Sequence, residues 1–187
     1  MKRTLVFAAA LAANASSPVW AGPFFAQLVL QDVTFQVESP NEGSINQVTV
    51  RAETPEGVLE PVVAEADGSI TGVESGDLNG DGYPEIYVYI NSAGSGSYGS
   101  LIAYASNRNK SLSRIYLPPI DEGSKAAQGY MGHDEFAVGE GALVRRFPVY
   151  REGDMNARPT GGTRQIQYRL EAGEASWVLR KDRTIDF

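Results

Sequence analysis

Cysteine is absent from the 187-residue sequence, and this absence excludes several kinds of chemistry. Without cysteine the chain has no disulfide bonds, no thiol nucleophile and no cysteine-ligated metal site. An extracellular eukaryotic domain of this size would be expected to carry disulfide bonds, whereas a bacterial exported domain often lacks them. The fold must therefore be stabilised by its hydrophobic core alone.

Histidine is almost absent, since the only one is His133, in the sequence Gly132-His133-Asp134-Glu135. A serine hydrolase would need this histidine as its base, and a serine on a sharp turn with glycine two residues to either side. Neither Ser95 nor Ser97 has glycines at both positions. A glycosidase needs only two carboxylates, but no pair stands out among the 23 acidic residues. We therefore expect His133 to be an ordinary loop residue and the protein not to be an enzyme.

Positive charge is also scarce, because 16 lysine and arginine residues stand against 23 acidic residues, a formal net charge of −7. Nucleic acids and anionic lipids are bound by clustered basic side chains, so neither nucleic acid nor a membrane is expected as a partner. The field of an acidic protein steers cationic molecules toward it. The composition therefore favours a cationic partner.

Long hydrophobic runs are confined to the N-terminus. A short basic head precedes an alanine-rich apolar segment, Thr4–Ala15, and Val19-Trp20-Ala21 then supplies the compact residues that a signal peptidase reads. The run is too short for a membrane-spanning helix, which needs about 20 apolar residues. We predict a signal peptide that is cleaved after Ala21, with cleavage after Ala15 as the alternative. Loss of the basic head brings the formal net charge of residues 22–187 to −9.

Helical periodicity is missing as well, since no run of twelve or more residues shows it. Instead, short segments alternate between apolar and polar residues, are rich in β-branched and aromatic side chains, and are separated by Gly, Pro, Asn and Asp. This pattern predicts an all-β fold in a single domain of residues 22–187, an antiparallel β-sandwich or flattened barrel of about 8–10 strands. The clearest strands are 33–37, 47–51, 85–90, 101–104, 164–170 and 176–180.

An acidic segment, residues 77–85, places oxygen-bearing side chains at alternate positions with glycine at the sixth. This spacing is typical of the first half of a calcium-binding loop. An EF-hand would add a glutamate at the twelfth position and a following helix, and both are missing. Asn-Gly and Asp-Gly are also strong turn dipeptides, so a polar hairpin turn without a metal remains the alternative. A bound calcium ion would have a structural role, and its ligands would be Asp77, Asn79, Asp81 and Glu85.

The segment Asn91–Ser100 lies between two predicted strands and contains three glycines and four serines. A plain hairpin would need only about two to five residues here. The glycines permit unusual backbone conformations, and the tip carries one large side chain, Tyr98, with hydroxyl groups beside it. Such a loop suits insertion into a narrow polar cleft, because serine hydroxyls donate to carboxylates and the ring packs as a rigid apolar group. The alternative is a flexible connector. Phosphate binding is disfavoured, since no lysine or helix accompanies the glycines.

At this loop the sequence resembles a known family. The tetrapeptide Ser95-Gly96-Ser97-Tyr98 is similar to the Ser-Gly-x-Tyr motif of bacterial periplasmic inhibitors of invertebrate-type (I-type) lysozyme. The acidic turn and aromatic strand before the loop, and the alternating strand after it, agree with this likeness. The C-terminal stretch 153–164 also resembles the family, so that the likeness would extend over most of residues 22–187.

The resemblance implies a periplasmic inhibitor from a Gram-negative bacterium whose partner is an I-type lysozyme. It further implies a β-sandwich whose exposed loop enters the lysozyme active-site cleft, with Ser95 and Tyr98 as the matching contact residues and no cofactor required. The loop would hydrogen-bond to the catalytic carboxylates and exclude the sugar. A ten-residue loop supplies less than the roughly 800 Å² that each partner buries in a standard inhibitor interface. A second contact loop is therefore expected, in Glu122–Glu135 or Pro159–Arg164.

Two other functions remain open from the residues alone. One is a periplasmic binding or adhesion module that calcium stabilises and that has no inhibitory activity. The other is a hydrolase with two carboxylates facing a pocket. Both a monomer and a homodimer are compatible with the sequence.

Overall fold

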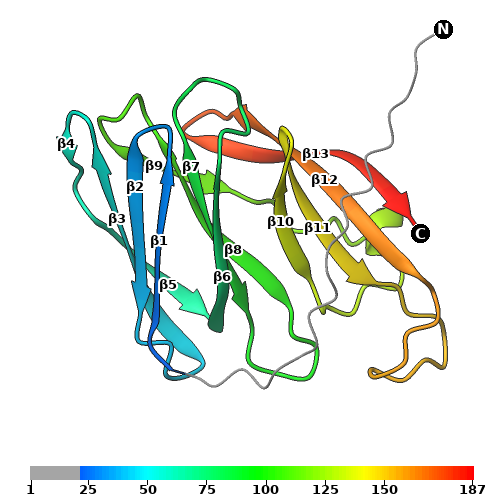
Figure 1. Cartoon of the computed structure of the whole chain (residues 1–187). Coiled ribbons are helices and arrows are strands. Elements are labelled where there is room, and N and C mark those ends of the chain that lie inside the picture. The colour runs from blue at the N-terminus through cyan, green and yellow to red at the C-terminus, as the bar shows by residue number, and fades with distance from the viewer. Residues whose placement is uncertain (1–21) are drawn as a thin grey trace, which may run out of the picture.

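The computed structural model describes residues 22–187 and shows an almost entirely β structure (Figure 1). Residues 1–21, predicted to be the signal peptide, lie outside the described residues. No helix in the described part of the chain is long and apolar enough to cross a membrane. The elements are β1 (Phe24–Leu30), β2 (Val33–Ser39), β3 (Ile45–Thr54), β4 (Gly57–Val58), β5 (Val62–Asp67), β6 (Ser69–Gly76), β7 (Glu85–Asn91), β8 (Gly99–Ser106), β9 (Leu112–Tyr116), the 3-10 helix η1 (Lys125–Ala127), β10 (Glu135–Gly139), β11 (Ala142–Pro148), β12 (Thr163–Ala172) and β13 (Trp177–Asp186).

The strands form two sheets. The smaller sheet has the order β1-β2-β3-β4, with β5 also paired to β3, and the larger sheet has the order β10-β11-β12-β13-β9-β8-β7-β6. All pairs are antiparallel except β13 with β9, which run parallel. The larger sheet curls until its two edge strands meet, since the backbone N–H of Val138 in β10 donates to the Glu74 carboxylate in β6. The expected all-β fold is therefore confirmed.

The described residues contain thirteen strands, more than the expected eight to ten. Strand β11 illustrates why some strands escaped the sequence pattern. Its buried positions are Leu143, Arg145 and Phe147, so a charged residue occupies the middle of its inward face. The expected alternation of apolar and polar residues is broken there, because a buried charge satisfied by a partner from another segment is invisible in the local sequence.

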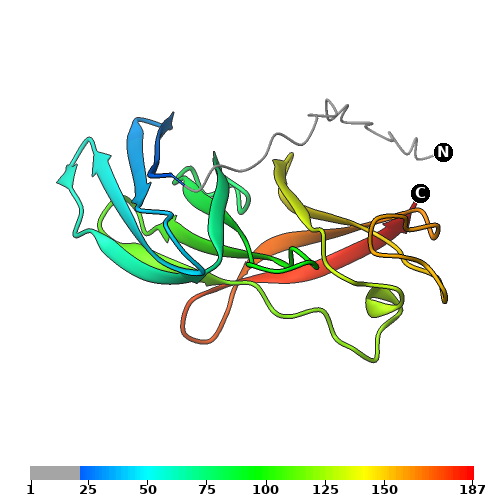
Figure 2. The same cartoon turned by 90° about the horizontal axis from the view of Figure 1, so that it is seen from below.

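Strand β7 is buried on both faces and divides the core in two. Ile86, Val88 and Ile90 pack with residues of β2 and β3 in the smaller sheet. Tyr87 and Tyr89 point the other way, toward the apolar side chains of β11, β12 and β13. Figures 1 and 2 show the consequence: the smaller sheet lies at one end of the molecule, the C-terminal strands lie at the other, and β6–β8 lie between them.

Candidate functional site

The connection between β7 and β8 is a closed loop, which we call the serine-glycine loop (Ser92–Tyr98). At its base, the backbone N–H of Ser92 donates to the Tyr98 carbonyl at 2.9 Å, and the Tyr98 N–H donates to the Ser92 hydroxyl at 3.0 Å. Within it, the Ser97 N–H donates to the Gly94 carbonyl at 3.2 Å. These hydrogen bonds define the path of the loop, so it is not a free connector.

The four residues of the predicted binding motif lie at the tip of this loop. Ser95 is exposed, Gly96 and Ser97 are half-buried, and the Tyr98 side chain is 49% exposed. The Tyr98 ring packs edge-on against Tyr130, with ring centroids 5.7 Å apart. It also lies over the Cα of Gly96, where an added Cβ would come within 2.5 Å of a ring carbon. Glycine at this position therefore lets the ring fold back while part of it faces solvent.

A distant segment, the support segment (Gly129–Asp134), holds the loop from one side. The backbone N–H of His133 donates to the carbonyl of Gly96 at 2.8 Å, and also lies 3.2 Å from the carbonyl of Ser97. Gly132 has a φ of +88°, and an added Cβ there would lie 2.0 Å from the Gly96 carbonyl oxygen. His133, expected to be an ordinary loop residue, thus lies in a loop but orients the predicted binding motif.

Asn156, from the connection between β11 and β12, holds the same loop from another side. Its side-chain N–H donates to the Ser95 carbonyl at 2.6 Å, and its side-chain oxygen lies 3.0 Å from Nε2 of His133. The Tyr150 hydroxyl donates to the Asn156 carbonyl at 2.8 Å and fixes its backbone. Sequence reasoning missed Asn156, since no local pattern links it to Ser95, 61 residues earlier.

A buried polar cluster lies beneath the loop. The Asp134 carboxylate accepts hydrogen bonds from the Gly99 N–H at 2.7 Å, from the Tyr130 hydroxyl at 2.7 Å and from Nε of Arg145 at 2.6 Å. The Arg145 guanidinium, almost fully buried, lies 5.2 Å from the Tyr130 ring centroid and 5.4 Å from that of Phe136. Burial raises the pKa of Tyr130, so its hydroxyl stays protonated and remains a donor. Each charge in the cluster has a partner, which is the condition under which a buried ion pair persists.

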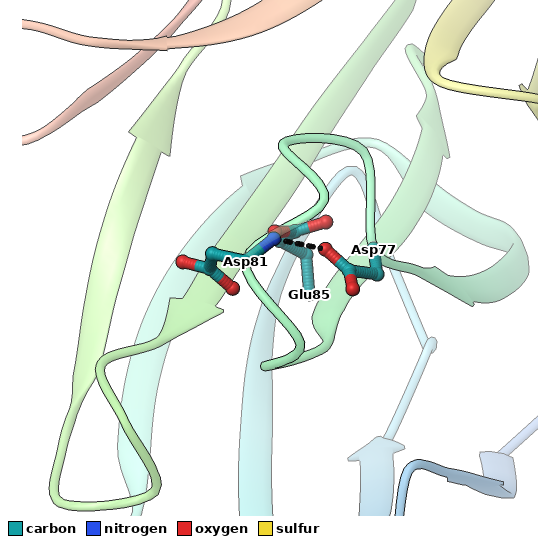
Figure 3. Close-up of side chains that lie close together, drawn as sticks. All are labelled: Asp77, Asp81 and Glu85. Atoms are coloured by element: carbon teal, nitrogen blue, oxygen red, sulfur yellow. Dashed lines mark hydrogen bonds between the residues drawn. The ribbon is translucent and has the colours of Figure 1, made fainter.

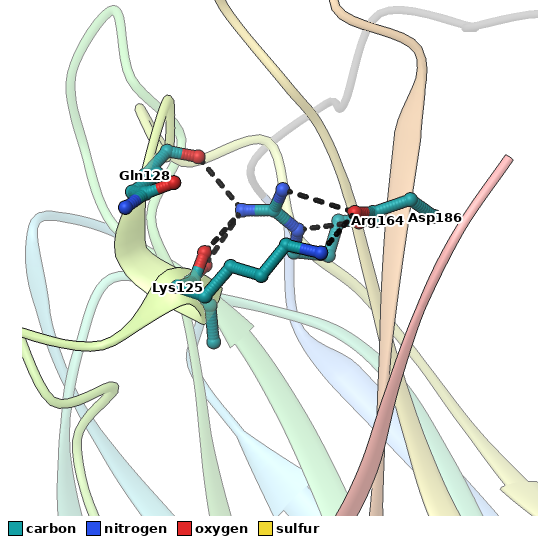
Figure 4. A network of polar contacts seen from close by, with 5 residues as sticks. Lys125, Gln128, Arg164 and Asp186 are labelled. Carbon is teal, nitrogen blue, oxygen red and sulfur yellow. Dashed lines mark hydrogen bonds and ion pairs between the residues drawn. The ribbon is translucent and has the colours of Figure 1, made fainter.

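The other end of the support segment is also fixed. The Arg164 guanidinium, which is 7% exposed, pairs with Asp186 at 2.6 Å and donates to the carbonyls of Lys125, Ala126 and Gln128 (Figure 4). The pKa of the Asp186 carboxyl is lowered by its hydrogen bond to Arg164. Arg164 thus attaches η1 to β12 and β13 immediately before the support segment begins.

An open groove with a volume of about 770 Å³ runs beside Tyr98. Glu122 is the only residue with a carboxylate among those that line it, so the groove lacks the carboxylate pair that a glycosidase would need. Its lining consists of Tyr98, Gly99, Ser100, Leu101, Arg114, Ile115, Tyr116, Leu117, Pro118, Pro119, Ile120, Glu122, Ala127, Tyr130 and Arg145.

At the opposite end of β7 lies the second predicted site, which we call the acidic loop (Asp77–Glu85). One carboxylate oxygen from each of Asp77, Asp81 and Glu85 lies within 4.8 Å of the others. Asn79 belongs to the same group, because its side-chain N–H donates to the Asp81 carboxylate at 3.1 Å. The structure therefore brings all four predicted ligand residues together.

Glu85 differs from the other acids of this loop because it is completely buried. Its Oε2 accepts hydrogen bonds from the Leu78 N–H at 2.7 Å and from the Tyr87 hydroxyl at 3.3 Å. Burial raises the pKa of Glu85 to about 8, and the nearby charges of Asp77 and Asp81 act in the same direction. The hydrogen bond from the Leu78 N–H lowers the pKa but does not offset the effect of burial. The side chain is thus held in place at a position that disfavours its charged form.

Comparison with known proteins shows that both loops lie in a region that matches one protein family. Residues 36–127 match the family described as periplasmic lysozyme inhibitor of I-type lysozyme. The crystal structure of PliI-Ah, an inhibitor of that description from Aeromonas hydrophila, is 34% identical, and the match covers 49% of this chain and 84% of that chain with a TM-score of 0.43. The structure of the Aeromonas hydrophila inhibitor in complex with Meretrix lusoria lysozyme is also 34% identical. This match covers 49% of this chain and 80% of that chain, with a TM-score of 0.42. A search of curated protein sequences finds no match.

The match contains both loops but not the segments that support the serine-glycine loop. The family match covers a little over half of residues 22–187 and ends at residue 127. The stretch 153–164, which seemed similar to the family, lies outside it, as do strands β10–β13. Turn-rich sequences of Gly, Asn, Asp and Pro recur in many β proteins, which makes them weak evidence of kinship.

Proposed function

The chain belongs to the family of periplasmic inhibitors of I-type lysozyme, and from this we propose that it blocks peptidoglycan hydrolysis by inserting the serine-glycine loop into the active-site cleft of such a lysozyme. It acts in the periplasm, the compartment of its family. There it stands between an arriving lysozyme and the cell wall. Inhibition is steric, so the protein needs no cofactor and performs no catalysis of its own.

The rigid presentation of the serine-glycine loop is the observation that carries this proposal. Tyr98 is half-exposed at a tip whose backbone is hydrogen-bonded to His133 and Asn156. A loop already fixed in its bound shape loses little conformational entropy on binding, which favours affinity. The exposed Ser95 hydroxyl can donate to a catalytic carboxylate, while the Tyr98 ring occupies space that the sugar needs.

The charge of the protein fits the same partner. Without residues 1–21 the formal net charge is −9. Enzymes that attack an anionic cell wall benefit from positive charge, and an acidic inhibitor would be drawn to such an enzyme at long range. Association should therefore slow as the salt concentration rises.

The second contact surface is proposed to come from the support segment and the neighbouring turn around Asn156, and this favours the first of the two predicted segments, Glu122–Glu135. Met131 is 43% exposed and Met155 is 63% exposed, each adjacent in sequence to a residue that contacts the serine-glycine loop. Methionine side chains adapt readily to an irregular partner surface. In the other predicted segment, Arg164 is buried and points to η1.

An inhibition assay tests the proposal. Purified residues 22–187 should inhibit an I-type lysozyme at a near-stoichiometric ratio in a peptidoglycan-lysis assay. Tyr98→Ala should weaken binding by about 2 kcal/mol, roughly a thirtyfold rise in the inhibition constant, if the ring is a hot spot. The matched control is Phe25→Ala, since Phe25 is 64% exposed but lies in the smaller sheet.

The outcomes separate the family function from the loop assignment. No inhibition of any I-type lysozyme by the unmodified protein would contradict the function itself. Full inhibition by Tyr98→Ala would leave the function standing and would show that another surface binds the enzyme.

A further inference from the structure

The acidic loop contains a buried oxygen atom without a hydrogen-bond partner. Oε1 of Glu85 is inaccessible to solvent, and no donor reaches it, although Oε2 of the same carboxylate is bonded to Leu78 and Tyr87. Buried polar atoms almost always have a partner, and a buried carboxylate without one is costly. An unpartnered oxygen of this kind points to a bound group that completes its surroundings.

The neighbouring groups are of the wrong charge to stabilise that oxygen by themselves. The other carboxylates beside it are those of Asp77 and Asp81, which come within 4.8 Å of that of Glu85 (Figure 3). Like charges at this distance repel. A cation between them would turn this repulsion into attraction.

We propose that the acidic loop binds one calcium ion through side-chain oxygens of Asp77, Asn79, Asp81 and Glu85. The ligand positions are the first, third, fifth and ninth of the loop, and Tyr83 stands at the seventh, where calcium loops use a backbone carbonyl. Gly82 at the sixth position has a φ of +83°, as the sharp turn of such a loop requires.

The chemistry of the ligands selects calcium over other metals. All are hard oxygen donors, and the acidic loop contains no histidine or cysteine for zinc or copper. Magnesium needs a compact octahedron and keeps several waters, whereas calcium accepts more ligands in looser geometry. A nine-residue loop with two glycines at positive φ, Gly80 and Gly82, can close around the larger ion.

Calcium bound here would stabilise the start of β7 without touching the serine-glycine loop. Strand β7 separates the two loops by seven residues, about 20 Å of extended chain. The calcium site would therefore take no part in lysozyme inhibition, and calcium binding can be tested without lysozyme.

Thermal unfolding of metal-free protein tests the proposal. Protein treated with EDTA and then dialysed should gain about 5–10 °C in Tm with calcium at 100 times its Kd, and much less with the same concentration of magnesium. Asp81→Asn keeps the turn-forming oxygen but removes a charge, and should abolish the gain. The matched control Asp67→Asn changes an exposed aspartate at the end of β5 and should retain it.

Glu85→Gln gives a second, independent readout. The glutamine amide is neutral, so the metal-free variant should be at least as stable as the metal-free parent. Its Tm should not rise when calcium is added. No calcium-dependent rise in the parent, or an equal rise in Asp81→Asn and Asp67→Asn, would overturn the proposal. Isothermal titration should give one calcium per chain, and lysozyme inhibition measured on the same samples separates this result from the proposed function.

Discussion

Two glycine-rich loops leave opposite ends of the buried strand β7, and they are stabilised in opposite ways. The acidic loop is held mainly from within, because Asp77 and Asp81 accept hydrogen bonds from backbone N–H groups no more than five residues away, and Gln31 adds one side-chain hydrogen bond to Asp77 from outside. The serine-glycine loop closes its own base but is held at its tip by His133 and Asn156, which come much later in the chain.

The difference shows which residues determine the conformation of each kind of loop. A loop that contains its own ligands and hydrogen-bond acceptors can be moved between proteins as a short sequence. The side chains of a binding loop must stay free to contact the partner, so they cannot also hydrogen-bond within the loop. Its conformation must therefore be fixed by contacts from other segments. In this chain those segments lie beyond residue 127, outside the family match.

Breaking the buried ion pair beneath the serine-glycine loop should have the largest effect. Asp134→Asn leaves the buried Arg145 guanidinium without a counter-charge, and the free energy of unfolding should fall by about 3–5 kcal/mol. Urea denaturation measures this loss. The matched control is Asp182→Asn, whose partner Arg169 is largely exposed, so the expected loss is below about 1 kcal/mol. Equal losses would show that the cluster contributes no more than a surface pair.

Replacing one glycine that contacts the serine-glycine loop and one glycine within the acidic loop should have different effects on inhibition. Gly132→Ala places a Cβ against the Gly96 carbonyl and should weaken lysozyme inhibition by about tenfold, or ~1.4 kcal/mol, through displacement of the loop. Gly80→Ala has a similar φ but no atom within 4 Å of the new Cβ, so it should affect Tm and not inhibition. Inhibition equally weakened by both variants would contradict the role of the support segment.

Removing the side-chain support should have a smaller effect. Asn156→Ala deletes the hydrogen bonds to Ser95 and His133, and each such bond is worth about 0.5–1.5 kcal/mol, so the inhibition constant should rise by two- to tenfold with little change in Tm. Asn107→Ala, in the turn between β8 and β9, removes comparable side-chain hydrogen bonds elsewhere and should leave inhibition intact. A larger change in Tm than in inhibition would point to a structural role.

Chelation of calcium should have the smallest effect on inhibition. At temperatures well below Tm, EDTA should change the inhibition constant by less than about twofold, since β7 separates the acidic loop from the serine-glycine loop by some 20 Å. Steady-state lysis assays with and without EDTA measure this. A change as large as that of Asn156→Ala would mean that β7 transmits the state of one loop to the other.

Much of the fold was predictable because the strands obey a period of two. The segment 85–90 was recognised as a strand from its β-branched and aromatic residues, and it became β7. Strand β11 was missed because Arg145 lies on its buried face. That arginine is tolerated only through Asp134 and Tyr130, which belong to a different segment of the chain.

The two candidate sites were predictable to different degrees for the same reason. Spacing alone identified Asp77, Asn79, Asp81 and Glu85 as neighbours, since a tight turn brings alternate positions together. The complete burial of Glu85 followed only from the packing around β7. The motif from Ser95 to Tyr98 could be located, and its contact with lysozyme stays a prediction. Its dependence on Asn156 could not be foreseen.

The place of β13 in the larger sheet makes completion of that sheet depend on the C-terminal end of the chain. Strand β13 lies between β12 and β9, although the ribosome makes it after both. During synthesis and export, which proceed from the N-terminus, the smaller sheet and β6–β8 can pair before β13 exists. The ladder between β9 and β12 needs β13, whereas β10 can reach β6 directly through the hydrogen bond from Val138 to Glu74. The last strand to be made is therefore the one that joins the two halves of the larger sheet into a continuous hydrogen-bonded ladder.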